Sequence, residues 1–178
     1  MSDQTADATS IDDRLERLSA RYTAAFAGAD INSFRAHFSI VRSGVRLSQA
    51  VGDFLNTHFG LNAARYSLLR ALYFTDGHRL QQSEVARAMD VTSPNVTQLI
   101  DALEREGLVE RVVSESDRRV TYAHLTHDGE TLCADAVPAM ARFMQETMVP
   151  FSSEEMDQLT ALLGRFRHHL SQTKNIPT

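Results

Sequence analysis

Apolar residues recur at helical spacing between positions 96 and 103, and this stretch organises the rest of the chain. Positions i, i+3, i+4 and i+7 are occupied by Val96, Leu99, Ile100 and Leu103, which form one stripe along a helix. The opposite face carries short or amide side chains that reach outward, namely Asn95, Thr97, Gln98 and Asp101. The pattern therefore predicts an amphipathic helix with one buried and one polar face.

A shorter helix is predicted just before it, because Val85, Ala86 and Met89 share one face. The segment 92–94 (Thr-Ser-Pro) then offers a hydroxyl cap and a proline in the first turn of the second helix. Two short helices joined by a tight turn are typical of a helix-turn-helix, whose second helix enters the major groove of DNA.

The period of the pattern changes after Gly107, a residue type that commonly ends helices. Residues 108–113 are rich in valine and residues 120–125 alternate between apolar and polar, so both predict strands joined by the polar residues 114–119. A short strand at Arg79-Leu80 is expected beside them. A helix-turn-helix followed by a hairpin is a winged helix, and the predicted fold class is mainly α with a small β-hairpin wing.

Helices are predicted on both sides of this core. The predicted segments are a disordered tail (1–9), N-terminal helices (10–60), the winged helix-turn-helix (61–126), C-terminal helices (127–171) and a tail (172–178). The N-terminal part comprises a first helix capped by Ser10 and a long helix from about 33 to 57. The long helix carries a narrow apolar seam that packs either within one subunit or against a partner subunit. A capping box from Ser152 to Glu155 predicts the start of the last helix.

The stretch EVARAMDVTSPNVTQLIDALEREGLVERVVSESDRRVTYAHLT resembles the DNA-binding core of the MarR family of bacterial regulators. The helix pair, the LEREGLVER exit, the DRR wing and the strand ending in LT carry the resemblance, which extends back to LNAARYSLLRAL at 61–72. In the resembled family, the terminal helices interlock between two subunits and serve for dimerisation. The resemblance therefore implies a homodimer on a pseudo-palindromic double-stranded DNA operator.

The exposed first two turns of the second helix hold the candidate DNA contacts Ser93, Pro94, Asn95, Thr97 and Gln98. An Asn or Gln amide can hydrogen-bond adenine, and a Ser or Thr hydroxyl can meet a phosphate or a base edge. The free N–H groups of the helix N-terminus also suit a phosphate. The alternative is that these residues are solvated polar side chains and nothing more.

The hairpin tip carries Asp117, Arg118 and Arg119, which resemble the Asp-x-Arg element of the family. By that resemblance, Asp117 and Arg119 brace the hairpin, while Arg118 at the tip reaches a minor groove, whose negative potential attracts arginine. Both arginines are candidate DNA contacts. The alternative is an exposed turn with an ordinary ion pair.

The resemblance also implies an effector pocket between the dimerising helices and the winged helix, which commonly receives small aromatic acids or phenols. Arg42, Arg46, Tyr66 and Arg70 are the candidate lining residues. An arginine would pair with a ligand carboxylate, and Tyr66 would stack on the ligand or hydrogen-bond to it. The alternative is that the arginines extend to the surface or form ion pairs between subunits.

Composition refines this interpretation. The 178 residues, 43% of them hydrophobic, suffice for one compact domain. The net charge of −5 by itself disfavours DNA, because phosphate neutralisation dominates DNA affinity. However, six arginines lie between residues 34 and 80. We also expect a dimer, in which the DNA contacts of the two subunits add together.

Other functions have little support in the sequence. The G-x-S-x-G, P-loop, G-x-G-x-x-G and H-E-x-x-H motifs are absent, so an enzyme is not expected. The spacing of the seven histidines predicts no metal site, and no cofactor is expected. The single cysteine, Cys133, is expected to be a small buried hydrophobe and fits a reducing cytoplasm. No apolar run approaches the length of about 18 residues that predicts a membrane span.

The sequence thus predicts a cytoplasmic, homodimeric winged-helix regulator of transcription that responds to a small effector, with repression favoured over activation. One alternative is a winged helix that binds a protein partner. Another is a metal- or thiol-responsive regulator of the same fold. The sequence predicts neither the operator, nor the controlled genes, nor the identity of the effector.

Overall fold

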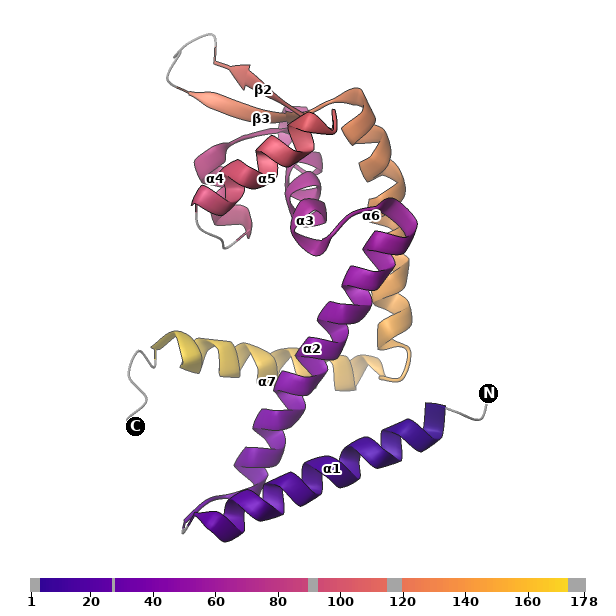
Figure 1. Ribbon diagram of the computed structural model, residues 1–178, viewed down its shortest axis with the longest axis vertical. Helices are drawn as coiled ribbons and strands as arrows, with labels where there is room; N and C mark the ends of the chain where they lie inside the picture. Colours follow the sequence, from indigo (N-terminus) through magenta and orange to yellow (C-terminus); the bar gives the residue numbers. More distant parts are fainter. Residues whose placement is uncertain (1–3, 27, 90–92, 115–119, 173–178) are drawn as a thin grey trace. The chain divides into compact units, whose positions relative to one another are not determined.

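The computed structural model describes residues 4–26, 28–89, 93–114 and 120–172 (Figure 1). The chain divides into two compact units, residues 1–63 and 64–178. Within the described residues, no helix combines the length and the apolar character needed to cross a membrane.

The first unit is a pair of helices, α1 (Gln4–Ala25) and α2 (Ile31–Phe59). Asp30 caps α2, because its carboxylate accepts hydrogen bonds from the backbone N–H groups of Asn32 and Ser33 at 3.1 and 3.0 Å. The helix ends at Gly60, whose φ of 65° lies in the left-handed region that glycine adopts without strain.

Aromatic rings hold α1 against α2. The ring centroid of Tyr22 in α1 lies 5.0 Å from that of Phe34 and 5.9 Å from that of Phe38, both in α2. An ion pair between Arg35 and Glu16, 3.2 Å long and exposed, adds little to this packing. The first unit is therefore a helical hairpin closed by an aromatic cluster.

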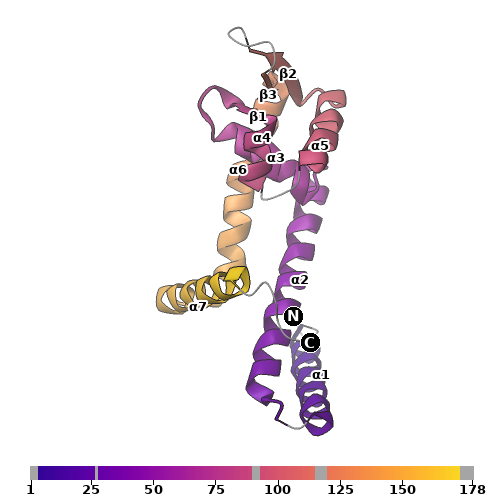
Figure 2. The same ribbon diagram turned by 90° about the vertical axis from the view of Figure 1, so that its left-hand side faces the viewer.

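The second unit contains the winged helix and two longer helices. Its elements are α3 (Ala63–Tyr73), the 3-10 turn η1 (Asp76–His78), β1 (Arg79–Gln81), α4 (Gln82–Met89), α5 (Ser93–Arg105), β2 (Val109–Val113), β3 (Thr121–Leu125), α6 (His127–Met148) and α7 (Ser153–Gln172). The strands form an antiparallel sheet in the order β1-β3-β2, with α4 packed beside β1 and α5 beside β2 (Figure 2). The predicted winged helix-turn-helix is confirmed.

The core of this unit is built from the apolar stripes that the sequence indicates. Val96, Ile100 and Leu103 of α5 are at most 2% exposed, and Val85 of α4 is fully buried, while Leu99 is half-buried. From the sheet, the buried side chains are Val109, Ala123 and Leu125. From α3 they are Tyr66, Leu68, Leu69 and Leu72.

The ends of two flanking helices differ from expectation. α1 begins at Gln4, so residues 4–9 are helical rather than a disordered tail, and Ser10 lies inside the helix instead of capping it. No glycine or proline interrupts this polar stretch, and its residues extend the first turn of the helix. α2 begins at Ile31 because Asp30 caps it.

The capping box predicted before the last helix is confirmed. The backbone N–H of Ser152 donates to Glu155 Oε2 at 2.8 Å, and the backbone N–H of Glu155 donates to Ser152 Oγ at 3.3 Å. The hydrogen bond from the Ser152 backbone N–H stabilises the ionised carboxylate and is the main cause of the lowered pKa of Glu155.

Candidate nucleic-acid interface

The seating of α5 on α4 determines which side chains of the recognition helix face outward. Burial of Val96 and Ile100 fixes the apolar face of α5 against the core. Gln98 lies on the opposite side and is exposed, so its amide is accessible to a partner. The geometry is that of a helix whose polar face is free to enter a groove.

Thr97 lies at the edge of this face rather than at its centre. Its side chain is half-buried, and its hydroxyl oxygen accepts a hydrogen bond from the Nε2 amide of Gln82 in α4. Thr97 therefore has a partner within the protein, and its contact with DNA stays a prediction.

The side chains of the remaining predicted DNA contacts lie outside the described residues. Ser93, Pro94 and Asn95 form the first turn of α5, but their side chains lie outside the described residues. The wing residues Asp117, Arg118 and Arg119 also lie outside them. Their roles in base contact and in bracing the wing stay predictions.

An arginine that the sequence analysis did not single out connects α5 to the hairpin. Arg111 in β2 forms ion pairs with Asp101 and Glu104, which lie one turn apart on α5. The hydrogen bond to Asp101 is the main cause of the raised pKa of Arg111. Asp101, expected to reach outward from α5, is thus engaged by the strand. The sequence signal for these ion pairs is two acidic residues three positions apart on a helix, followed by an arginine on the next strand.

A second arginine holds the C-terminal end of the recognition helix. Arg65 in α3 forms an ion pair with Glu106, immediately after α5. Together with Arg111, it ties the C-terminal part of α5 to the two elements that flank it. The contacts of Arg111 orient the recognition helix relative to the sheet, and the contact of Arg65 orients it relative to α3.

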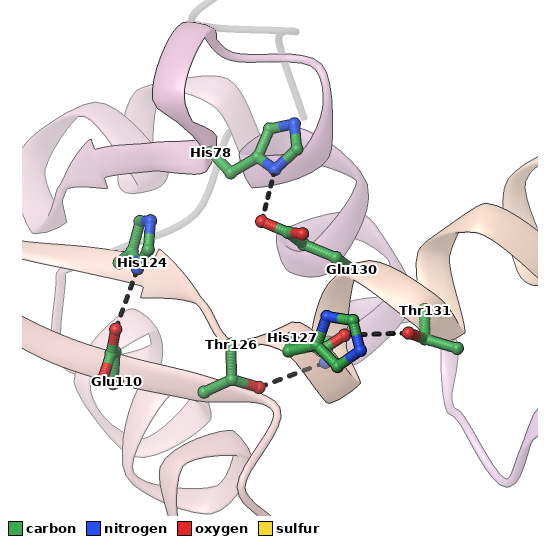
Figure 3. Close-up of polar contacts among 8 residues, drawn as sticks. His78, Glu110, His124, Thr126, His127, Glu130 and Thr131 are labelled. Carbon is green, nitrogen blue, oxygen red and sulfur yellow. Dashed lines mark hydrogen bonds and ion pairs between the residues drawn. The ribbon is translucent and has the colours of Figure 1, made fainter.

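One histidine–carboxylate pair joins η1 to the first turn of α6, and another links the strands β3 and β2 (Figure 3). His78 Nδ1 lies 2.9 Å from Glu130 Oε1, and His124 Nδ1 lies 2.9 Å from Glu110 Oε1 on the neighbouring strand. The hydrogen bond with His78 is the largest influence on Glu130 and lowers its pKa. Arg79 lies over the ring of Tyr122, 5.2 Å from its centroid.

The predicted effector residues are divided between the two units. Arg42, half-buried, and Arg46, exposed, belong to α2, whereas Tyr66, buried, and Arg70, exposed, belong to α3. Burial is the main cause of the raised pKa of Tyr66. A cavity of about 410 Å³ lies elsewhere, at the junction of α6 and α7, lined by Met144, Gln145, Met148, Val149, Phe151 and Met156. The effector pocket stays a prediction.

Cys133 is buried in α6, as expected for a small hydrophobe, and burial raises the pKa of its thiol to about 11. Such a thiol is a poor nucleophile at neutral pH. Among the residues that the structure describes, no group of three or more His, Cys, Asp or Glu side chains is arranged to hold a metal ion.

Known proteins resemble the chain in sequence over most of its length. Residues 59–120 match the model of the MarR family. The HTH-type transcriptional regulator MhqR of Bacillus subtilis is 32% identical over 133 residues, which cover 73% of this chain and 90% of the relative. The HTH-type transcriptional repressor YetL of the same species is 26% identical over 150 residues, covering 84% of this chain and 89% of the relative.

Solved structures resemble it in fold. The S. aureus MepR–DNA complex has a TM-score of 0.67 at 26% identity, covering 75% of this chain and 96% of MepR. Sco3205 of Streptomyces coelicolor, a MarR family transcriptional regulator in complex with DNA, has a TM-score of 0.73 at 20% identity, covering 80% of this chain and 89% of Sco3205. The similar proteins named here are transcription regulators, not enzymes. With the winged helix-turn-helix in place and MhqR similar over most of both chains, this chain belongs to the MarR family of transcription regulators.

Proposed function

We propose that the protein is a cytoplasmic repressor of transcription that binds a pseudo-palindromic operator as a homodimer and releases it when a small aromatic or phenolic effector binds. The observation that carries the DNA-binding part is the exposed polar face of α5, with Gln98 outward and Val96 and Ile100 buried beneath it. In this proposal two recognition helices enter successive major grooves, about 34 Å apart. The DNA complexes of MepR and Sco3205 support this assignment.

Exposed apolar side chains support the homodimer. No residue of α7 is buried within the described structure, and Leu159, Leu162 and Leu170 on this helix are 37%, 59% and 49% exposed. On α2, Val41 and Val45 of the predicted seam are about half exposed. Apolar faces of this extent usually mark an interface. A second copy of the chain is the partner that family membership favours.

The effector is proposed from resemblance together with the chemistry of four residues. Arg42, Arg46 and Arg70 supply guanidinium groups for a carboxylate or phenolate, and the buried Tyr66 supplies an aromatic face. An effector acts by binding one arrangement of the dimer more tightly than the other. Its test is the loss of operator binding on addition of small aromatic acids. If the acids release the operator from the Tyr66→Leu variant as readily as from the natural protein, this pocket is contradicted.

The decisive experiment selects the purified protein on randomised duplex DNA and then measures binding of the selected duplexes at several salt concentrations. An inverted repeat, bound tightly and with strong salt dependence, is the expected result because phosphate contacts release counterions. Sedimentation of the complex with a single duplex then measures how many chains it contains. One chain per operator would contradict the homodimer.

The alternative is a winged helix that binds a protein partner. It predicts weak DNA binding with no enriched sequence and little dependence on salt. A metal- or thiol-responsive regulator of the same fold predicts that operator binding changes with added divalent cation or with thiol reagents. The buried Cys133, with its raised pKa, favours the small-effector version over a thiol sensor.

A further inference from the structure

A direct polar contact links the two helices of the helix-turn-helix. Gln82 is the first residue of α4, and its Nε2 amide donates a hydrogen bond to Oγ1 of Thr97, the fifth residue of α5. Both side chains are half-buried. Val85 of α4 and Val96 of α5 are fully buried, and apolar side chains of this kind hold helices together without selecting a rotamer on the outer face.

The backbone around Gln82 is held from two sides. The preceding residue, Gln81, is paired with Tyr122 in the sheet. The backbone N–H of Gln81 also donates to Oε2 of Glu84 at 2.8 Å, which satisfies a free donor at the start of α4. The backbone at Gln82 is therefore held in place, and its side-chain amide can position a residue of α5.

The hydrogen bond from Gln82 can select the χ1 rotamer of Thr97. A threonine within a helix divides between two χ1 rotamers, because its hydroxyl can also bond to the carbonyl of the preceding turn. In one of the two rotamers, the hydroxyl occupies a direction that the methyl group occupies in the other. At a DNA interface the difference matters, since a hydroxyl meets phosphates or polar base edges and a methyl group packs on the thymine methyl.

We propose that Gln82 is a positioning residue that determines the sequence specificity of α5 by holding Thr97 in one rotamer. The inference rests on the proposed DNA-binding function. Gln82 acts through Thr97 and does not itself read a base. Loss of the amide removes this hydrogen bond to the Thr97 hydroxyl, so that Thr97 also populates the other rotamer and discrimination at the base pairs facing it falls while general affinity is retained.

The test compares Gln82→Leu, which retains the apolar stem, with Thr97→Val, which retains the shape of threonine, and with the double variant. Affinities are measured for the selected operator, for all single-base variants of it and for an unrelated duplex. We expect each single change to reduce discrimination at the same base positions by roughly 3- to 10-fold, the effect of one hydrogen bond. The double variant is expected to lose no more than either single variant.

The matched control is Thr97→Ser, which keeps the hydroxyl and removes only the methyl group. In this variant a further Gln82→Leu change should still alter the base preference, whereas in Thr97→Val it should not. Thermal midpoints of all variants are recorded, because a merely structural role of Gln82 lowers stability without changing base preference.

A measurement that needs no DNA tests the rotamer directly. Three-bond couplings to the labelled Thr97 methyl carbon report χ1, and we expect one rotamer in the natural protein and averaged values in Gln82→Leu. Averaged couplings in the natural protein overturn the proposal. So do additive losses in the double variant, or a uniform loss on all duplexes with a smaller salt slope, which would make Gln82 a phosphate contact. If selection on randomised duplex DNA enriches no sequence, the proposed function is contradicted, and the role of Gln82 in specificity is contradicted with it. If a sequence is enriched but the losses in the double variant are additive, only the role of Gln82 is contradicted.

Discussion

Gly129, in the first turn of α6, packs so closely on Leu108 that a Cβ atom at position 129 would lie 2.1 Å from the Leu108 carbonyl oxygen. This is a contact with backbone, which cannot turn aside as a flexible side chain does. The same turn is capped by Thr126, whose hydroxyl accepts from the Gly129 N–H at 3.1 Å and donates to the Gly107 carbonyl at 2.5 Å. The start of α6 is thereby fixed to the end of the recognition-helix segment.

Gly129→Ala is therefore expected to destabilise the protein by about 3 kcal/mol or more, at the upper end of overpacking effects. The measurement is urea unfolding followed by far-ultraviolet circular dichroism. The matched control is Gly164→Ala in α7, where Arg167 Nη2, at 3.9 Å, is the one atom of the described residues that the added Cβ would have within 4 Å. That change should raise stability by about 1 kcal/mol, since alanine favours a helix interior. Equal effects of the two changes would contradict the close approach at Leu108.

Arg111→Met should loosen the recognition helix without unfolding the domain. The ion pairs of Arg111 with Asp101 and Glu104 are partly exposed, so we expect a loss of only about 1 kcal/mol in unfolding free energy. Salt screens such pairs, and the difference from the natural protein should shrink in 1 M salt. Operator affinity should fall more than stability does, because the orientation of α5 is no longer fixed by β2.

The control for Arg111→Met is Arg142→Met, on the exposed surface of α6. It removes the same charge from the chain and so corrects for the change in net charge. A loss of affinity as large in Arg142→Met would mean that the total charge, rather than the ion pairs of Arg111 with α5, determines binding.

Arg118→Ala and Gln98→Ala should weaken DNA binding in different ways. If Arg118 reaches a minor groove, its removal lowers affinity on most operators and reduces the dependence of affinity on salt. If Gln98 contacts a base edge, its removal alters sequence preference more than total affinity. Binding of selected and unrelated duplexes across a salt series separates the two. An unchanged salt slope in Arg118→Ala would remove the wing from the DNA contacts.

The parts of the fold that the sequence predicted are those determined by local periodicity. The stripe of Val96, Ile100 and Leu103 repeats with the turn of a helix, and its burial follows from any packing of that helix on a core. The capping box at Ser152 and Glu155 is likewise local, since both partners lie within one turn.

Contacts between elements could not be read in the same way. Gln82 and Thr97 are 15 positions apart, and Arg65 and Glu106 are 41 apart, so their pairing depends on the tertiary arrangement of helices. The start of α1 was missed for a different reason, because residues 4–9 carry neither an apolar stripe nor a helix breaker. The sequence therefore predicted the outward face of α5, but it did not predict the side chains that orient this helix, such as Gln82 and Arg65.

Glu130→Gln tests the link between α6 and the η1 turn through its pH dependence. The His78 contact lowers the pKa of Glu130 below its ordinary value of 4.5, so its ionised form is favoured in the folded state. The resulting stabilisation is complete above the ordinary pKa and is lost as pH falls through the lowered value. Stability of the natural protein should therefore fall more steeply below about pH 5 than that of Glu130→Gln.

Unfolding free energies from urea titrations between pH 3 and pH 7 measure this difference. Glu146→Gln, an exposed change near the other end of the same helix, is the control and should follow the natural protein. Parallel pH profiles for Glu130→Gln and the natural protein would show that the His78–Glu130 contact contributes nothing in solution.

Cys133 provides the last prediction, and it separates a small-effector regulator from a thiol sensor. With a pKa of about 11 and a buried side chain, only about one thiol in a thousand is ionised at pH 8. Reaction with a disulfide reagent such as DTNB should be at least about 100-fold slower in the folded protein than in guanidinium chloride. The raised pKa also means that stability is present below the ordinary pKa of 9.0 and is lost as pH rises toward about 11, because the unfolded thiol ionises first. Cys133→Ala should flatten this alkaline loss, whereas rapid modification of the folded protein with release of operator DNA would make the thiol, and not a small ligand, the regulatory group.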